Sequence, residues 1–398
     1  MGLTDLPDRA DVVVVGGGIM GASTAYFLTE ATDRDVLVLE KDEIASGSTG
    51  DSSAIIRHHY GPSEIYARTA AWSHDFYRAF EERTGEAIAY APNPMVRFAT
   101  EGTPSGDYVE AGADVLRALD LPVSRHEGDE LDAAYPMLEL DDIDFAVSDD
   151  DSAYSDGTDV AGGFARAAQN QGATVVTGVA VTDVLVEDEA IAGVETDEGT
   201  VEADEVVLAA GPWTPRLAAT VGLDVPIEPM REQVVILDPP ADFSEESLPD
   251  LPSGGPPGGD WYLRPDFGEG VLVATHHTGG ETDPDTYDRT PDQSTLLDLT
   301  EKIGAFAPGL AEAGVQGQYC GVYSTTPDHD FVIDQAGPDG CYLACGFSGH
   351  GFKHAPAVGR LVTDLVTGAE SSLVDVEFFA LDRFEDDPTG HGVPDDKI

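Results

Sequence analysis

Residues 11 to 40 carry the pattern that most constrains this chain. They read as an apolar strand, a glycine-rich turn, a helix of small residues and a second strand ending at Glu40. Gly16 permits a tight bend, Gly18 lets a pyrophosphate approach the helix N-terminus, and Gly21 lets helix and strand pack closely. Glu40 stands where a carboxylate accepts a hydrogen bond from an adenosine ribose, and it would repel a 2′-phosphate. We therefore predict a dinucleotide-binding unit that disfavours NADP, while the motif alone leaves NAD and FAD open.

The charge of the chain is strongly acidic. Its 398 residues include 76 Asp and Glu against 20 Lys and Arg, a formal net charge of −56. Such a surface argues against partners that are nucleic acids or anionic membranes. The acidic residues are spread along the sequence rather than gathered in a tail, and this resembles the salt-adapted proteins of haloarchaea. We expect a halophilic protein.

Other features of the sequence predict a soluble cytoplasmic protein. No apolar stretch reaches the length of a membrane span, and Met1 to Arg9 contain no apolar signal region. The three cysteines, Cys320, Cys341 and Cys345, form an odd, low number that suits a reducing compartment. We expect no metal site, because a zinc centre at Cys341 and Cys345 would lack its remaining ligands.

The order of elements favours an α/β fold with two domains. Texture typical of nucleotide-binding domains occurs at the start of the chain, near 156–211 and at the end, whereas a nicotinamide-binding domain is usually contiguous. This interleaving favours a flavoprotein. Helices are predicted over 64–82, 107–119, 291–307 and 356–366 and from Asp156 onward; strands over 173–177, 179–186, 191–195, 204–210, 225–238, 260–278, 315–324 and 341–345.

Three stretches carry a resemblance to a known family. They are Leu39-Glu-Lys41 through Ile55-Ile-Arg-His-His-Tyr-Gly61, Val206 to Trp213, and Tyr323 to Asp328 leading to Gly346-Phe-Ser-Gly-His-Gly-Phe-Lys353. In order and spacing the chain resembles the FAD-dependent D-amino-acid oxidase superfamily, and within it the sarcosine oxidase and dimethylglycine dehydrogenase-like members.

The resemblance implies a fold and a reaction. Residues 1–85, 151–215 and 325–383 would form a Rossmann-like FAD-binding domain, and 86–150 and 216–324 a mixed-sheet substrate domain. Composition rich in Asp, Pro and Gly predicts that 384–398 form a polar, loosely ordered tail. The flavin ring would lie where the two domains meet. The implied reaction is oxidation of the C–N bond of a small amino acid, such as sarcosine or another N-methyl or D-amino acid, by hydride transfer to flavin N5. An imine forms, which water hydrolyses.

FAD is the implied cofactor, and the residues expected to bind it fall in the glycine-rich turns and the strand ends around them. They are Gly16, Gly18, Ile19, Met20, Gly21, Glu40, Lys41, Ser48, Thr49, Ala180, Gly211, Trp213, Gly346, Ser348, Gly349, His350, Gly351 and Lys353.

Two basic residues match the family positions that bind the substrate carboxylate. Arg57 supplies a planar fork and Lys353 a point charge, although each could also be a salt-bridging cation in an acidic protein. His277 matches an active-site histidine of sarcosine oxidases and could orient the amine or keep it unprotonated. His276 beside it is the alternative, and a structural histidine remains open.

Aromatic and basic residues complete the expected substrate site. Tyr262 and Tyr323 match positions lining the cavity, where aromatic walls exclude water and attract a methylated ammonium; core packing is the other interpretation. Arg264 replaces an aromatic residue of monomeric sarcosine oxidase. If it points inward, the substrate could carry a second carboxylate or be a bulkier acid.

Departures from the family bear on the cofactor linkage and the electron acceptor. Relatives attach FAD to a cysteine at the position of Gly321, next to Cys320, or to a histidine at the position of Asp51, so we expect non-covalent FAD. The lysine that is thought to activate oxygen aligns with Val273, which suggests an acceptor other than oxygen. Because this single position does not decide the matter, three classes of electron acceptor stay open: oxygen, a quinone and an electron-transfer protein.

Two alternatives remain open at this point. A 2-hydroxy-acid dehydrogenase shares the superfamily and is favoured by Arg264, whereas the Ile55–Gly61 motif opposes it. The chain could also be the flavin-carrying subunit of an electron-transfer assembly.

Overall fold

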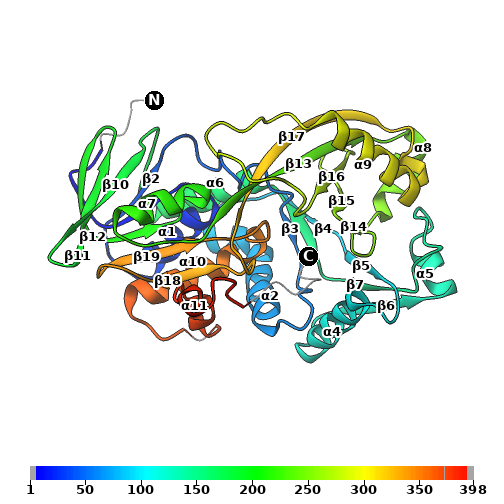
Figure 1. Cartoon of the computed structure of the whole chain (residues 1–398), viewed down its shortest axis with the longest axis horizontal. Helices are drawn as coiled ribbons and strands as arrows, with labels where there is room; N and C mark the ends of the chain where they lie inside the picture. The colour runs from blue at the N-terminus through cyan, green and yellow to red at the C-terminus, as the bar shows by residue number, and fades with distance from the viewer. Residues whose placement is uncertain (1–5, 372, 392–398) are drawn as a thin grey trace.

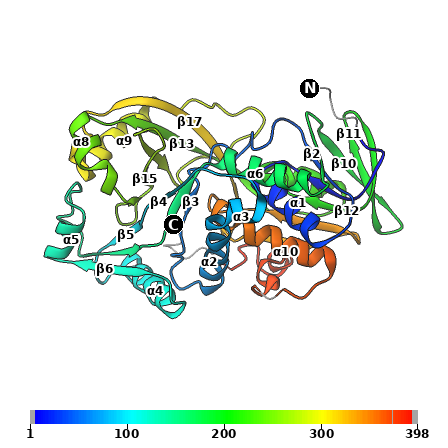
Figure 2. The ribbon, with the colours of Figure 1, turned by 180° about the vertical axis from the view of Figure 1, so that it is seen from behind.

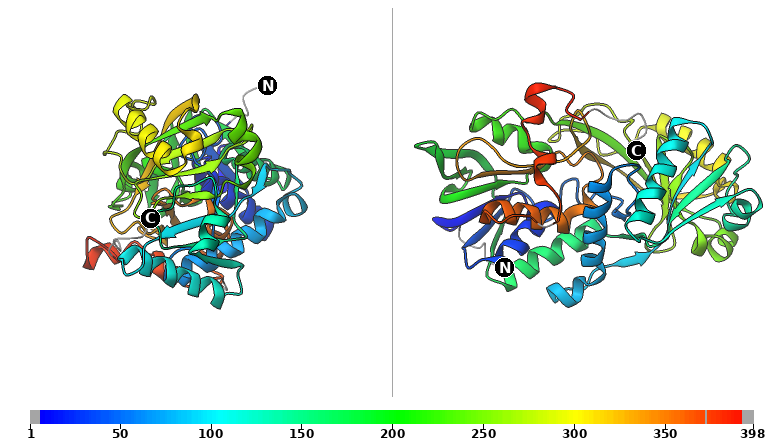
Figure 3. Two further views of the ribbon diagram at one scale, coloured as in Figure 1. Left: turned by 90° about the vertical axis from the view of Figure 1, so that its right-hand side faces the viewer. Right: turned by 90° about the horizontal axis from the view of Figure 1, so that it is seen from below.

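The structure, a computed structural model, describes residues 6–371 and 373–391. Two large sheets lie toward opposite ends of the long axis of the molecule, as Figure 1 and the right-hand view of Figure 3 show. A helix-rich region lies between them. None of the helices in the described residues combines the length and the apolar character that a membrane span requires.

The first sheet is built around the N-terminal strand. Its members are β1 (Arg9–Val15), β2 (Val36–Glu40), β9 (Thr174–Thr177), β10 (Val181–Glu187), β11 (Ala190–Thr196), β12 (Gly199–Leu208), β18 (Val332–Gln335) and β19 (Cys341–Cys345). β1 lies between β2 and β12 and is parallel to both, while β19 extends the parallel set beyond β12. Val12 and Val14 pack into one apolar cluster and Val13 and Val15 into another, as alternation along a doubly covered strand requires.

Helices from distant parts of the chain cover one face of this sheet. α1 (Ile19–Ala31), α6 (Gly157–Asn170) and α10 (Ala355–Thr367) share a single core with α2 (Glu64–Arg78), and Figure 2 shows them gathered on that side. The opposite face is covered in part by α7 (Thr214–Thr220). Cys341 and Cys345 are both buried in that second cluster, so they are core residues on one side of β19.

The second sheet forms the other end of the molecule. Its members are β5 (Met95–Ala99), β6 (Val123–Glu127), β7 (Phe145–Asp149), β13 (Glu228–Asp238), β14 (Ser253–Gly255), β15 (Trp261–Pro265), β16 (Val271–Thr275) and β17 (Gly314–Thr325). Residues 260–278, expected as one long strand, form the hairpin β15–β16 instead. The prediction was wrong because the turn at 266–270 contains Gly268 and Glu269, both with positive φ.

Smaller elements connect and cover the sheets. A short sheet of β3 (Ile55–Ile56), β8 (Ala153–Ser155) and β4 (Tyr90–Pro92) lies between the large ones. The remaining helices are α3 (Phe80–Thr84), α4 (Pro104–Ala118), α5 (Asp129–Ala134), α8 (Ala241–Glu246), α9 (Gln293–Phe306) and α11 (Arg383–Asp386).

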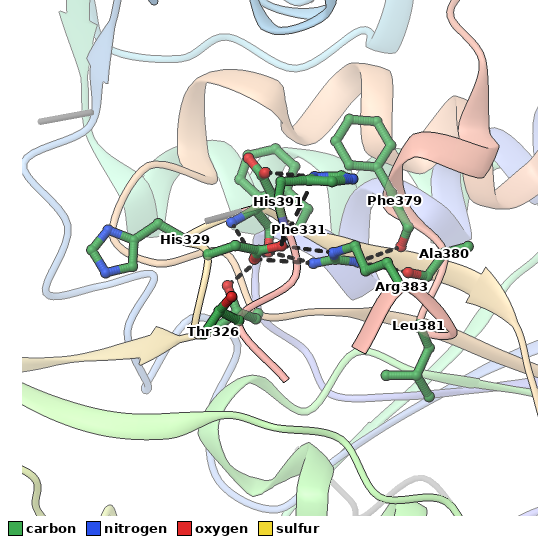
Figure 4. A network of polar contacts seen from close by, with 12 residues as sticks. Thr326, His329, Phe331, Phe379, Ala380, Leu381, Arg383 and His391 are labelled. Atoms are coloured by element: carbon green, nitrogen blue, oxygen red, sulfur yellow. Dashed lines mark hydrogen bonds and ion pairs between the residues drawn. The ribbon is translucent and has the colours of Figure 1, made fainter. Parts of the chain in front are cut away.

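The end of the described chain is tied back to the segment between β17 and β18 (Figure 4). Arg383 Nε donates to Asp328 at 2.8 Å, and His391 Nδ1 lies 2.9 Å from a carboxylate oxygen of Asp330. Tyr66 donates to the other oxygen of Asp330 at 2.8 Å. Although two carboxylates and a histidine meet here, their oxygens already accept hydrogen bonds from protein donors, so the cluster serves as an ion-pair network.

This network corrects one expectation from the sequence. Residues 384–398 were expected to form a loosely ordered tail, but α11 and His391 are held in place. Residues 392–398 lie outside the described residues. The contacts could not be foreseen because the partners, near residues 328 and 391, are far apart in sequence.

Candidate active site

A cavity of about 790 Å³ opens at the carboxyl ends of the parallel strands of the first sheet and reaches β13 and β17. This is the edge at which open α/β sheets bind ligands. It is lined by most of the residues expected to bind the cofactor: Gly16, Gly18, Ile19, Met20, Glu40, Lys41, Ser48, Thr49, Ala180, Gly211, Trp213, Ser348, Gly349 and Gly351.

The cavity walls fit a dinucleotide. Gly16 has φ +113°, and a Cβ atom on Gly21 would lie 1.9 Å from the carbonyl oxygen of Gly16, so the turn and the strand–helix packing both require glycine. The N–H of Gly17 donates to one oxygen of Glu40 at 2.6 Å, which holds that carboxylate at the end of β2. A cradle without side chains next to a fixed carboxylate suits a pyrophosphate and a ribose.

Four of the expected cofactor residues lie elsewhere, and one of them, Lys353, lines a smaller neighbouring cavity. Gly21 and Gly346 do not line the large cavity; Gly346 has φ +67° and packs against Thr326. His350 lies on a second cavity instead, where its Nε2 is 2.9 Å from the carbonyl of His329. These positions shape the site through backbone geometry or face the neighbouring cavity.

The second cavity has a volume of about 160 Å³ and adjoins the first. Ser53, Tyr262, Tyr323 and Gly349 line both. A small cavity beside a dinucleotide site is a suitable place for a small substrate.

Two cations enter this small cavity from different elements. Arg57 follows β3, its guanidinium lies 4.2 Å above the ring of Tyr60, and it donates to the carbonyl of His59. Lys353 lies in the short helix Phe352–His354 and donates to the carbonyl of His350 at 3.4 Å. Both side chains are buried, and neither has a carboxylate within ion-pair distance among the described residues. Burial first, and then Arg57 and Arg97, hold the pKa of Lys353 well below its usual value.

Of the two adjacent histidines, His276 is the one that lines the small cavity. Its Nδ1 lies 3.3 Å from the hydroxyl of Tyr323, and burial, followed by His277 and nearby cations, keeps its pKa well below the usual range. His277 has φ +52° and stacks on His329 with ring centres 4.3 Å apart. The structure therefore places the alternative, His276, at the cavity, and His277 in a stack beside it.

The aromatic candidates lie where the sequence suggested, whereas Arg264 does not. Tyr262 and Tyr323 form the wall that the two cavities share. Arg264 is buried but faces neither cavity: it forms an ion pair with Asp266 at 2.8 Å and donates to the carbonyl of Ser53. Arg264 favoured a substrate with a second carboxylate, or a 2-hydroxy acid, only if its side chain pointed into the site. It lines neither cavity, so this support is lost.

Val273 is also placed differently from the expectation. It is paired with Val235 and Leu263 on neighbouring strands and shares their buried cluster with α9, on the face turned away from the cavities. The next residue, Ala274, lines the large cavity. The argument that a valine stands where an oxygen-activating lysine would lie is wrong, because sheet register points its side chain to the other face.

Gly321 and Asp51, the two positions expected from the resemblance to bear on covalent attachment of FAD, lie side by side. A Cβ atom on Gly321 would lie 2.9 Å from the Cβ of Asp51, and both residues line the large cavity. The carboxylate of Asp51 pairs with Arg289 at 3.0 Å. Neither position carries the cysteine or histidine that the resemblance associates with covalent attachment.

Sequence reasoning missed one cation of the small cavity. Arg97, on β5, lines it together with Arg57 and Lys353. The only signal was a basic residue within the apolar strand Met95–Ala99, in a segment whose path could not be derived.

A buried carboxylate fixes the segment that carries Arg57. Asp149, at the end of β7, accepts hydrogen bonds from the backbone N–H groups of His58 and His59 and lies 2.8 Å from His58 Nδ1. His58 Nε2 lies 2.8 Å from His74 Nδ1, and His74 Nε2 lies 2.6 Å from the hydroxyl of Tyr90. The chain of contacts holds the backbone on the C-terminal side of Arg57 against β7 and α2.

Comparison with known proteins agrees with this geometry. The family model described as DAO, FAD dependent oxidoreductase, matches residues 11–365. The sequence is 28% identical over 385 residues to monomeric sarcosine oxidase of a Bacillus species (strain B-0618), an alignment that covers 94% of this chain and 96% of that protein. It is 26% identical over 407 residues to mitochondrial dimethylglycine dehydrogenase of Rattus norvegicus, covering 97% of this chain and 45% of the relative.

A solved structure shows the same architecture along nearly the whole chain. L-proline dehydrogenase from P. horikoshii superimposes with a TM-score of 0.86 at 27% identity, covering 96% of this chain and 99% of that one. The mixed α/β fold with two domains, expected from the sequence, is confirmed.

Proposed function

Because the chain belongs to the DAO family of FAD-dependent oxidoreductases, we propose that it oxidises the C–N bond of a small amino acid. The observation that carries the proposal is the small cavity, where Arg57 and Lys353 lie beside a wall shared with the cofactor cavity. The similarity to sarcosine oxidase and dimethylglycine dehydrogenase supports an amine as the substrate.

The residues of the cavity have distinct tasks in this proposal. Arg57 and Lys353 bind the substrate carboxylate, because charge-assisted hydrogen bonds from two directions fix its orientation. Tyr262 and Tyr323 exclude water and face the amine. Burial and nearby cations keep the pKa of His276 well below its usual range, so its neutral imidazole orients the amine as a hydrogen-bond partner. When bound in the large cavity, FAD would supply the acceptor for the hydride of the substrate, and water would hydrolyse the imine.

The test is anaerobic reduction of the bound flavin by a panel of N-methyl, D- and L-amino acids. The loss of flavin absorbance measures the reduction. At least one amino acid is expected to bleach the flavin. Arg57→Ala and Lys353→Ala should each raise the half-saturating concentration about 30- to 150-fold while FAD content stays unchanged. Arg68→Ala, which removes an exposed arginine paired with Glu64, is the matched control. A flavin that only 2-hydroxy acids bleach, or that no amino acid bleaches, would refute the proposal.

We propose further that FAD is bound without a covalent link, since Asp51 and Gly321 stand where relatives have their attachment residues. Cys320 is buried, and burial raises the pKa of its thiol to about 11, which disfavours the reactive thiolate. Acid precipitation should release all of the yellow colour into the supernatant. A flavin-bearing peptide recovered from the washed pellet would contradict this.

The division into domains is part of the same proposal. Residues 1–85, 151–215 and 325–383 would bind FAD, and 86–150 and 216–324 would form the substrate domain. In support, the strands of the first sheet all come from the former ranges, and those of the second come from the latter to within one residue. We also propose that the protein works in the cytoplasm of a salt-adapted, haloarchaeal cell; its acidic composition supports this.

A further inference from the structure

The wall of the large cavity contains a buried carboxylate that the proposed reaction does not use. Glu232, on β13, is 2% exposed and lines this cavity. Burying a carboxylate costs free energy unless hydrogen-bond donors satisfy its oxygens. Among the described residues Glu232 forms no ion pair with a lysine or arginine, and its donors are uncharged groups.

The donors to Glu232 all come from one turn. The hydroxyl of Thr275, the last residue of β16, donates to Oε2 at 2.6 Å, and the N–H of Gly279 donates to Oε1 at 3.1 Å. The N–H groups of His277 and Thr278 also form hydrogen bonds with the carboxylate. Four donors match the four acceptor positions of an ionised carboxyl group. A single side chain thus holds the backbone of residues 275–279.

This turn has a backbone that its surroundings must hold in place. His277 has φ +52°, a conformation that residues other than glycine rarely adopt and that persists only where contacts impose it. A Cβ atom on Gly279 would collide with the carbonyl oxygen of Arg231. The N–H of Arg231 donates to the carbonyl of Gly280 at 3.0 Å. The turn therefore packs directly on β13 beside Glu232.

His276 lies inside the segment that Glu232 holds. The residues before and after it both donate to the carboxylate, and its own N–H donates to the carbonyl of Asp260 at 2.9 Å. Its imidazole lies edge-on to the rings of Tyr262 and Tyr323, with ring centres 5.8 Å apart in both pairs, at the wall of the small cavity. The direction of the imidazole therefore depends on the backbone of the turn.

We propose that Glu232 is a positioning residue for the substrate amine: by holding the turn 275–279, its carboxylate directs the imidazole of His276 into the small cavity. The inference rests on the proposed amino-acid oxidation and adds to it a residue that acts without touching the substrate, since Glu232 lines the large cavity and not the small one. Arg57 and Lys353 lie on other elements, so binding of the substrate carboxylate does not depend on this turn.

Glu232→Gln tests the proposal in the FAD-loaded protein. The side chain keeps its size, but an amide NH₂ group now faces N–H donors and the turn loses an acceptor. The limiting rate of anaerobic flavin bleaching by an amino acid of the panel should fall about 10- to 100-fold, while the half-saturating concentration changes by a smaller factor. Glu228→Gln, at an exposed position of the same strand, is the matched control and should leave both unchanged. An unaltered limiting rate in Glu232→Gln would overturn the inference.

A second variant separates positioning from a merely structural role. His276→Ala removes the imidazole, so Glu232→Gln should slow bleaching no further when His276→Ala is already present. Rate losses that multiply in the double variant would overturn the inference. Glu232→Asp keeps the charge on a shorter side chain and should recover part of the rate that Glu232→Gln loses. If Glu232→Gln does not retain FAD, the same comparison with Glu232→Asp decides between the two outcomes.

Hydrogen exchange measures the turn itself, without turnover. In Glu232→Gln the peptide containing residues 277–279 should exchange about 5- to 150-fold faster than in the wild type, because the loss of a buried hydrogen bond makes local opening easier. Equal exchange would overturn the inference. If an amino acid bleaches the wild type but Glu232→Gln matches it in rate or in exchange, the inference fails while the proposed oxidation stands. If no amino acid bleaches the wild type, both fail.

Discussion

At the scale of single residues, six buried histidines have a pKa below the ordinary value. Burial is the largest cause of a lowered pKa in each of them, and each is therefore neutral in the folded protein near pH 7. They are His59, His74, His276, His277, His350 and His354. In the unfolded chain these imidazoles regain an ordinary pKa of about 6.5, so acid favours unfolding.

His59 contributes to the loss of stability in acid, because burial lowers its pKa to about 4 in the folded state. Between pH 6.5 and 4 the unfolded chain binds a proton that the folded protein does not, so stability falls as the pH falls. The wild type should lose about 2 to 3 kcal/mol through this residue by pH 4.5. The stability difference between wild type and His59→Gln, measured by urea unfolding in molar KCl, should shrink by that amount between pH 7.5 and 4.5. A difference independent of pH would contradict the prediction.

Single residues also show how far sequence reasoning reaches. Gly16, Gly21 and Glu40 could be predicted because one local motif fixes all three. The place of Arg97 could not, because it depends on how β5 pairs with β14 and β7, contacts between distant segments. Val273 was misplaced because a one-residue uncertainty in a strand reverses the face to which a side chain points.

At the scale of elements, β7 supports the substrate site although it contributes no side chain to the cavity lining. Asp149 ends the strand and accepts two backbone N–H groups from the segment after Arg57. With Asp149 ionised, the contacts fit Tyr90 donating to His74, His74 to His58, and His58 to Asp149. Each donor of this chain of contacts then has an acceptor.

Asp149→Asn should therefore act on substrate binding through Arg57. An amide offers only one acceptor oxygen, so a buried donor loses its partner, and the free energy of unfolding should fall by about 1–3 kcal/mol. The half-saturating substrate concentration should rise while FAD content and the limiting bleaching rate change little. Asp150→Asn, an exposed neighbour bonded to Ser124, is the control. Unchanged half-saturation in a folded Asp149→Asn protein would show that the network does not position Arg57.

At the scale of the whole molecule, the net charge of −56 sets the conditions under which the fold is stable. Many of the arginines form ion pairs at the surface, such as Arg9 with Asp204 and Arg216 with Asp283. The chain has too few cations to pair with the remaining carboxylates. Their mutual repulsion opposes the compact state.

The melting temperature should consequently climb between dilute buffer and molar KCl, because the Debye length falls from about 10 Å at 0.1 M to about 3 Å at 1 M. Scanning calorimetry of the FAD-loaded protein across this range measures the change. A melting temperature that stays constant would show that the surface carboxylates do not destabilise the fold, and would remove the support for a salt-adapted origin.

The pairing of β1 sets the order of events during synthesis. Val12 lies next to Glu205 in the sheet, and the cofactor cavity takes its last lining residues from near Phe352. At about 5–20 residues per second a ribosome needs roughly 20–70 s to make 350 residues. In the first part of that time β1 has no partner on its β12 side, and in the rest the cavity still lacks its final segment. The cofactor cavity therefore stays incomplete until the segment near Phe352 has been made, and β1 lacks its neighbour on one side until β12 has been made.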